Sequence, residues 1–219
     1  MDRLITVTGT GSVSVAPDYI EVYLNISGRK KDYAKAVDAA NDKVLRLQEA
    51  IKSCGFDKEA LKTTNFRVDV QYENVRDEKG AYHQQFVGYL CHYDMVLGFA
   101  FDTKLLSKVL SEIAQSKAEP ELNIQFTVEN ADAVRRELLQ SAAQNDREKS
   151  EILCQASGVQ LGKLVNIDYN WADRNFVSAT RYAVSNDAMP LMAKRAAAPE
   201  FTPENIQVKD SAAFRWLMV

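Results

Sequence analysis

The chain has 219 residues, of which 46% are apolar and 26% are charged, the balance of a folded protein with one large or two small domains. Its 27 basic and 30 acidic residues give a net charge of -3, which provides no electrostatic argument for nucleic acid or an anionic membrane as a partner. No apolar run approaches the roughly 20 residues of a membrane-spanning helix. The start also lacks the pattern of a secretory signal, so we expect a cytoplasmic protein, or a periplasmic one if a signal peptide was removed.

The N-terminal segment predicts two strands. Apolar residues and glycines alternate with Thr and Ser across residues 5–15, without a break at Gly9 and Gly11. Pro17-Asp18 then predicts a turn, and residues 19–27 alternate again. We expect these two strands to form a hairpin.

The glycine pair in this first strand resembles the start of a phosphate-binding loop. A dinucleotide-binding loop needs a third glycine three residues after Gly11 and a helix to follow, whereas this chain has Ser14 and a further strand. We therefore expect extended backbone at Gly9 and Gly11, a closely packed neighbour above them, and no ligand.

The clearest helix covers residues 33–54. Asp32 can cap its first turn, and Gly55 can end it. Its apolar residues recur at alternating spacings of four and three, which predicts one face packed on a sheet. These residues are Tyr33, Val37, Ala40, Val44, Leu47, Ile51 and Cys54.

Residues 61–75 and 84–101 predict a long hairpin with a polar tip around Gly80. The second strand is longer than the usual limit of about 10 residues. It therefore predicts a bulge near Gly88 or Gly98, or an arm that projects beyond the sheet. The residues expected on the inner face of the first strand are Phe66, Val68, Val70 and Tyr72.

The second half of the chain continues with a short helix after Asp102, a strand over residues 121–128 and a long helix from Asn130 to about residue 157. The middle of the long helix, residues 144–151, is polar nearly all round, so we expect it to be solvated or to touch another subunit. The apolar residues expected to face inward in the short helix and the strand are Leu106, Val109, Leu110, Ile113, Leu122, Ile124, Phe126 and Val128.

Two more strands are predicted, over residues 163–171 and 205–219. Between them, residues 172–205 are rich in Ala, Pro and charge and show no period. A loop of this length is unusual within a compact domain, and such loops are more often mobile or in contact with a partner.

The order of elements is therefore ββαββαβαβ, a long loop and a last strand. This order predicts an α+β fold in a single domain, residues 1–219, with three helices on one face of a two-layer, mostly antiparallel sheet with long hairpins.

Several motifs in this order resemble the SIMPL domain family. They are ITVTGTGSVSVAPDYIEV at the start, the helix AKAVDAANDKVLRLQEAIKSCGF, Thr63-Thr64-Asn65-Phe66, Gly88-Tyr89, and the third helix ending in ASGVQLGKLVNI before a final apolar strand. The resemblance covers nearly the whole chain, but Thr202-Pro203-Glu204-Asn205 stands where the family often has Pro-Gly. Bacterial members usually carry an export signal, which this chain does not show.

The resemblance implies an α+β fold, a tendency to form homo-oligomers and no established catalytic activity. It supplies no catalytic residues. An envelope or stress-related role rests on the resemblance alone.

Histidine is scarce in the chain, with only His83 and His92. His92 and Asp94 share a face of one strand and could form a cluster with Arg67, although a surface polar patch explains them as well. Two histidines and scattered cysteines do not make a convincing three-ligand metal site.

Other chemical patterns are equally weak. The cysteines Cys54, Cys91 and Cys154 are odd in number and widely spaced, so we expect reduced and mostly buried thiols, with a redox or intermolecular role as the alternative. Structural or surface roles explain the remaining candidates. We expect Glu148 and Glu151, beside Arg147, to lie on a solvated helix face, and Tyr169, Trp171 and Trp216 to be core aromatics. Lys194-Arg195 is too small a basic group to bind nucleic acid.

We therefore expect no catalytic, metal-binding or cofactor-binding residue. The leading hypothesis is a non-enzymatic protein that forms homo-oligomers and acts through protein contacts, made by the hairpin around Gly80, the polar third helix and residues 172–205. The alternative is a small-molecule-binding or weakly catalytic domain, with a pocket between sheet and helices near Tyr89, Tyr169 and Trp171.

Overall fold

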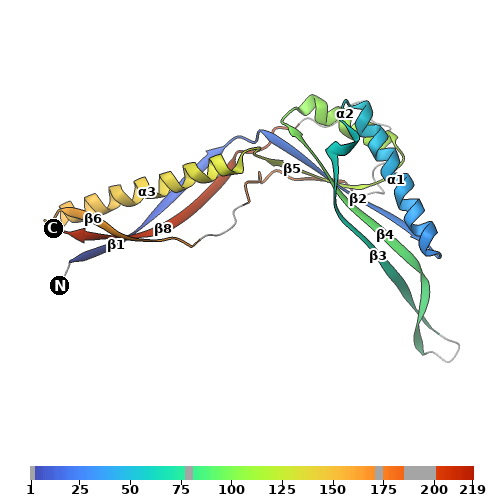
Figure 1. The fold of residues 1–219 in the computed structure, drawn as a ribbon, viewed down its shortest axis with the longest axis horizontal. Helices are drawn as coiled ribbons and strands as arrows, with labels where there is room; N and C mark the ends of the chain where they lie inside the picture. Colours follow the sequence, from blue (N-terminus) through green and yellow to red (C-terminus); the bar gives the residue numbers. More distant parts are fainter. Residues whose placement is uncertain (1–2, 77–80, 171–174, 185–200) are drawn as a thin grey trace. The chain divides into compact units, whose positions relative to one another are not determined.

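The structure is a computed structural model that describes residues 3–76, 81–170, 175–184 and 201–219. The chain divides into two compact units. The first contains residues 1–18, 127–179 and 203–219, and the second contains residues 19–126 and 180–202. The fold is α+β, and the helices and strands follow the predicted order, with one additional short strand within residues 172–205 (Figure 1).

The first unit is a three-stranded sheet covered by one helix. Its strands are β1 (Leu4–Val15), β8 (Ile206–Met218) and β6 (Leu161–Asp168), in the order β1-β8-β6, and its helix is α3 (Ala131–Ala156). Both strand pairs are antiparallel. The buried residues Val13, Val134, Leu138, Ile206 and Val208 form part of a core between the sheet and the helix.

The glycine pair of β1 lies directly under α3. A Cβ atom added to Gly9 would lie 2.1 Å from the carbonyl oxygen of Ala142, and one added to Gly11 would lie 2.1 Å from that of Leu138. The expected close neighbour above the glycines is therefore confirmed. Only glycine lets the helix backbone approach the strand so closely.

Polar side chains of α3 also cover the open edge of β1. The backbone N–H of Thr10 donates to Oδ1 of Asn145 at 2.9 Å, and Nζ of Lys149 donates to the carbonyl oxygen of Thr8 at 3.1 Å. The N–H of Ser12 points to the hydroxyl of Ser141 at 3.4 Å. A free strand edge invites pairing with other chains, and these bonds occupy it.

The second unit is a five-stranded sheet with two helices on one face. Its strand order is β3-β4-β2-β5-β7. The strands are β2 (Tyr19–Lys30), β3 (Leu61–Arg76), β4 (Tyr82–Ala100), β5 (Glu121–Thr127) and β7 (Tyr182–Val184), and the helices are α1 (Tyr33–Ser53) and α2 (Thr103–Gln115), with a short 3-10 turn at Lys58–Ala60.

The core of the second unit lies between this sheet and its helices. The four apolar residues predicted to face inward from α2 are all buried, as are Leu122, Ile124 and Phe126 of β5. In α1 the buried face is shifted from the prediction, because Ala36 and Ala50 are buried whereas Tyr33 is exposed. Side-chain carboxylates of Asp32 and Asp102 cap the two helices as expected.

The predicted hairpin of β1 and β2 is wrong. β1 pairs along its whole length with β8, and β2 pairs with β4. Asp18 makes no hairpin turn, because its N–H donates to the carbonyl of Thr127 and its carboxylate accepts from the N–H of Glu129. Alternation identifies a strand but not its partner, and β8 alternates just as β1 does.

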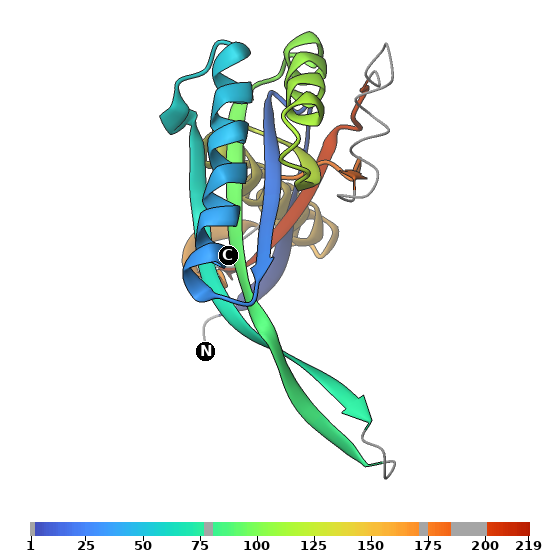
Figure 2. The ribbon, with the colours of Figure 1, turned by 90° about the vertical axis from the view of Figure 1, so that its right-hand side faces the viewer.

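The long hairpin of β3 and β4 is confirmed. The register shifts between Gln71 and Tyr72, opposite Gly88 and Phe86, which places the expected bulge next to Gly88. β2 pairs with β4 only as far as Tyr89, so beyond that point β3 and β4 continue as a two-stranded arm. Figure 2 shows this arm extending past the end of α1.

Two further expectations need correction. The middle of α3 is not solvated all round, because Asp146 and Ser150 are fully buried. Residues 172–205 were expected to be irregular, yet their described part contains β7, which pairs with β5, and a bridge from Val177 to Thr127. Residues 172–174 and 185–200 of that segment lie outside the described residues.

Candidate functional site

The face of the five-stranded sheet opposite the helices carries polar side chains. These come from the outward positions of the alternating strands, since the apolar positions face α1 and α2. They include Glu21, Tyr23, Asn25 and Ser27 of β2, Asn65, Arg67 and Asp69 of β3, His92 and Asp94 of β4, and Glu121 and Asn123 of β5.

Asp94 is the centre of a hydrogen-bond network on this face. Its carboxylate accepts from the side-chain amides of Asn25 and Asn65, the latter at 2.9 Å. The hydroxyl of Thr64 donates to its backbone carbonyl at 3.1 Å. These donors occupy both carboxylate oxygens, so Asp94 holds β2, β3 and β4 together.

The expected cluster of His92, Asp94 and Arg67 is rearranged. Arg67 and His92 are direct partners in the register of β3 and β4, but both lie near Asp69 and not Asp94. Nε of Arg67 is 3.2 Å from Oδ2 of Asp69, and Nε2 of His92 is 3.8 Å from the same atom. Nδ1 of His92 is buried and has no hydrogen-bond partner among the described residues. Asp69 was not singled out from the sequence.

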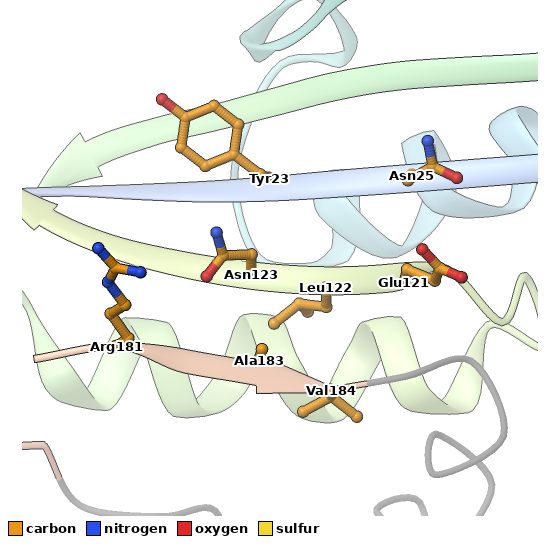
Figure 3. Close-up of a pocket in the computed structure, with 8 residues that line it drawn as sticks. All are labelled: Tyr23, Asn25, Glu121, Leu122, Asn123, Arg181, Ala183 and Val184. Carbon is orange, nitrogen blue, oxygen red and sulfur yellow. The ribbon is translucent and has the colours of Figure 1, made fainter.

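A pocket of about 660 Å³ lies beside this network, where β2, β5 and β7 adjoin. Figure 3 shows Arg181 at one end of the pocket and Glu121 at the other, with Asn123 between them. The remaining lining residues are Tyr23, Asn25, Leu122, Ala183 and Val184. The pocket is an open groove on the sheet face, and its volume lies within the range of small-molecule sites.

Tyr23 borders the pocket as a protonated phenol. Its hydroxyl donates to a carboxylate oxygen of Glu21 at 2.7 Å. Burial, together with this hydrogen bond and the charge of Glu21, raises the pKa of Tyr23 to about 12. The phenol therefore stays neutral at physiological pH, and its oxygen can still accept a hydrogen bond from a ligand.

A fully buried carboxyl, that of Asp146, lies in the other unit on the face of α3 that packs against the sheet. Trp216 donates from Nε1 to Oδ2 of Asp146 at 2.9 Å, and the hydroxyl of Ser150 lies 3.4 Å from Oδ1. Burial raises the pKa of Asp146, while Trp216, Ser150 and Lys149 act in the opposite direction. The carboxyl is fully buried and bonded to Trp216, so we assign it a structural role.

Comparison with known proteins decides the family. The model of SIMPL, described as a protein of unknown function (DUF541), matches residues 5–216. The chain belongs to the SIMPL family.

Two curated relatives are similar to the chain over most of its length. It is 24% identical over 163 residues to the 26 kDa periplasmic immunogenic protein of Brucella melitensis, which covers 74% of this chain and 65% of the relative. The match therefore spans less than two thirds of that relative. It is also 24% identical over 207 residues to the uncharacterized protein YggE of Edwardsiella ictaluri, covering 94% and 83% of the two chains.

A solved structure of an uncharacterized conserved protein from Listeria innocua aligns with 96% of this SIMPL chain and 92% of its own. The sequence identity is 10% and the TM-score is 0.19, too low to support any argument about fold.

The cysteines of the SIMPL chain are free and buried, as expected. Burial is the main cause that raises the pKa of Cys54, and it also raises the pKa of Cys91. Thiols with raised pKa values are poor nucleophiles because little thiolate is present. Within the described parts of the chain, no three His, Cys, Asp or Glu side chains are grouped to hold a metal ion.

The remaining candidates have structural surroundings. Arg147 pairs with Glu151 at 3.0 Å on the exposed face of α3, as predicted. Tyr89 packs edge-on against Tyr33 and Phe86, and the hydroxyl of Tyr169 donates to Asp210 at 2.8 Å. His83 lies on the exposed arm opposite Val75, whereas Trp171 and Lys194-Arg195 lie outside the described residues.

The sequence alone does not locate this pocket. The only sign of the pocket in the sequence is the polar residues at alternate positions of residues 19–27 and 121–127. This pattern does not show which strands lie next to each other in the sheet. None of the helices in the described part of the chain combines the length and apolarity needed to cross a bilayer.

Proposed function

We propose that this SIMPL protein is non-enzymatic and acts through self-assembly and protein contacts. The observation that carries the proposal is the arm of residues 71–76 and 82–88, which bears exposed aromatic side chains. Tyr72 is 56% exposed, Tyr82 is 73% exposed and Phe86 is 44% exposed.

The arm has little to hold it in an isolated chain. Within the described part of the chain it consists of two strands with no third strand paired to them, and a lone two-stranded hairpin is at best marginally stable in water. The rings of Tyr72 and Phe86 lie 6.1 Å apart, and those of Phe86 and Tyr89 lie 5.4 Å apart. Covering this aromatic row would remove apolar surface from water and stabilise the arm.

We propose a second copy of the chain as the partner of the arm. A second apolar surface on the same chain supports this choice. β6 is an edge strand, and its side chains Leu164, Val165 and Ile167 are all exposed. An exposed apolar edge strand is a common site of pairing between chains.

The surroundings of the carboxylate and thiol groups that could act in catalysis support the non-enzymatic part of the proposal. The carboxylate of Asp94 is occupied by two amides, and the three thiols are buried. The place of action that we propose is the bacterial envelope, because two relatives carry the name periplasmic immunogenic protein.

Hydrogen exchange tests the role of the arm. We expect the amides of residues 71–76 and 82–88 to exchange fast in dilute protein and to become protected as concentration rises. The amides of Leu97 and Phe99, in the sheet core, serve as the control and should stay protected throughout. Equal exchange of the arm at all concentrations would contradict self-assembly through it.

A further inference from the structure

The pocket on the open sheet face has opposite charges at its two ends. In the antiparallel register of β5 and β7, Asn123 pairs with Ala183 and Ile124 pairs with Tyr182. Extending this register by one residue places Arg181, which directly precedes β7, opposite Gln125. Glu121 is four residues from Gln125 along β5, a distance of about 13 Å at the rise of a strand. Asn123 projects between the two charges (Figure 3).

The charged groups at both ends of the pocket belong to side chains that are exposed among the described residues. Among the described residues, neither the guanidinium of Arg181 nor the carboxylate of Glu121 has a side-chain partner within the same sheet. Asn25 gives an amide N–H to Asp94, which leaves its carbonyl oxygen to accept. The pocket therefore presents a cation, an anion and two amides, over apolar surface from Leu122, Ala183 and Val184.

We propose that this pocket binds a short zwitterionic peptide of about three residues in an extended conformation. The carboxylate of the peptide binds the guanidinium of Arg181, a geometry that allows two parallel hydrogen bonds. The ammonium binds the carboxylate of Glu121. The amides of Asn25 and Asn123 hydrogen-bond the peptide groups between the ends.

The distance between the two charged ends of the pocket and the opposite signs of their charges favour a ligand of this length and charge. Three extended residues span about 10 Å, and rotation of the long, exposed Arg181 side chain can cover the rest of the 13 Å or so between the two positions. A single amino acid holds its charges too close together to reach both ends. A ligand with one charge leaves the opposite group of the pocket without a partner.

This site lies within one chain and is independent of the proposed self-assembly. We suggest titrating the full chain, labelled with 15N, with trialanine and following its amide resonances. The expected result is saturable shifts confined to β2, β5 and residues 181–184. Trialanine with an acetylated amino end and an amidated carboxyl end should bind more than tenfold more weakly, because it has neither charge.

Variants locate the binding groups. Arg181→Gln and Glu121→Gln should each weaken trialanine binding about fivefold, the effect of one exposed ion pair. Arg67→Gln, on the same sheet face but outside the pocket, is the matched control and should bind as the wild type does. The double exchange Glu121→Arg with Arg181→Glu should restore binding, with the peptide reversed.

Three outcomes would overturn the proposal. They are the absence of saturable shifts, equal binding of the blocked peptide by the unaltered chain, and shifts centred outside the pocket. The blocked peptide needs no variant, so the test remains decisive even if a substitution disturbs folding.

Discussion

The indole Nε1 of Trp216, on β8, donates a 2.9 Å hydrogen bond to the carboxyl of Asp146, on α3. Asp146 has no exposed surface. This bond joins the polar middle of the long helix to the last strand. A buried carboxyl is costly when ionised, and the pair therefore makes the stability of the first unit dependent on pH.

Burial raises the pKa of Asp146 in the folded chain above the usual value of 3.8. The folded state therefore holds the proton more tightly than the unfolded state, and ionisation costs stability as pH rises from the unfolded pKa through the folded one. Asp146→Asn removes this titration. We expect the free energy of unfolding of the variant, relative to the wild type, to increase with pH across that window, as measured by denaturant unfolding.

The exposed Gln144→Ala on the same helix, which removes no ionisable group, is the control for Asp146→Asn. Its difference from the wild type should stay nearly constant with pH. A constant difference for Asp146→Asn as well would show that burial does not shift this carboxyl.

The close approach of α3 to β1 predicts that Gly9→Ala and Gly11→Ala are strongly destabilising. Each added methyl would lie 2.1 Å from a helix carbonyl oxygen, so strand and helix must separate. Overpacking of this kind costs about 1–3 kcal/mol, measured by denaturant unfolding. Thr10→Ala, between them on the exposed face, should change stability by less than about 0.5 kcal/mol. Equal stabilities for all three variants would refute the packing explanation.

The bond from the Thr10 N–H to Asn145 predicts a local effect on the edge of β1. Asn145→Ala leaves this N–H without its partner, at a cost of about 1 kcal/mol. We expect faster hydrogen exchange at Thr10, with exchange at Gly9 and Gly11 less affected. The exposed Gln144→Ala is the matched control, and unchanged protection of Thr10 in Asn145→Ala would show that the edge is held by other contacts.

The buried thiols predict slow reaction with a thiol reagent. Cys54, Cys91 and Cys154 are all buried, and burial raises the pKa of the first two. We expect little reaction of the native protein with Ellman's reagent and reaction of all three thiols after denaturation. Rapid modification of the native protein would point to the redox role that the sequence left open.

The predictable part of the fold was the part that depends on local pattern. Asp32, Asp102 and Asn130 marked the helix starts, and alternation marked the strands. Partner choice was not local: β1 joins β8 across nearly the whole chain, which no short window can reveal. The separation of the strands into two sheets follows from the same long-range pairing.

The buried polar residues were equally hidden. Asp146 and Ser150 lie in a stretch that is polar all round, and only the position of Trp216 shows which side is buried. Glu121 and Arg181 are far apart in sequence and adjoin one pocket only because β7 pairs with β5. The family resemblance, by contrast, could be recognised from the order of motifs and is confirmed.

The molar mass in solution, measured by light scattering over a wide concentration range, tests the central proposal of self-assembly most directly. We expect the wild type to exceed its monomer mass of 24.6 kDa, and Tyr72→Ser with Phe86→Ser to shift it towards the monomer. Leu45→Ser, at a residue of α1 that is 54% exposed, should assemble as the wild type does. A wild type that stays at 24.6 kDa at every concentration would contradict the proposal.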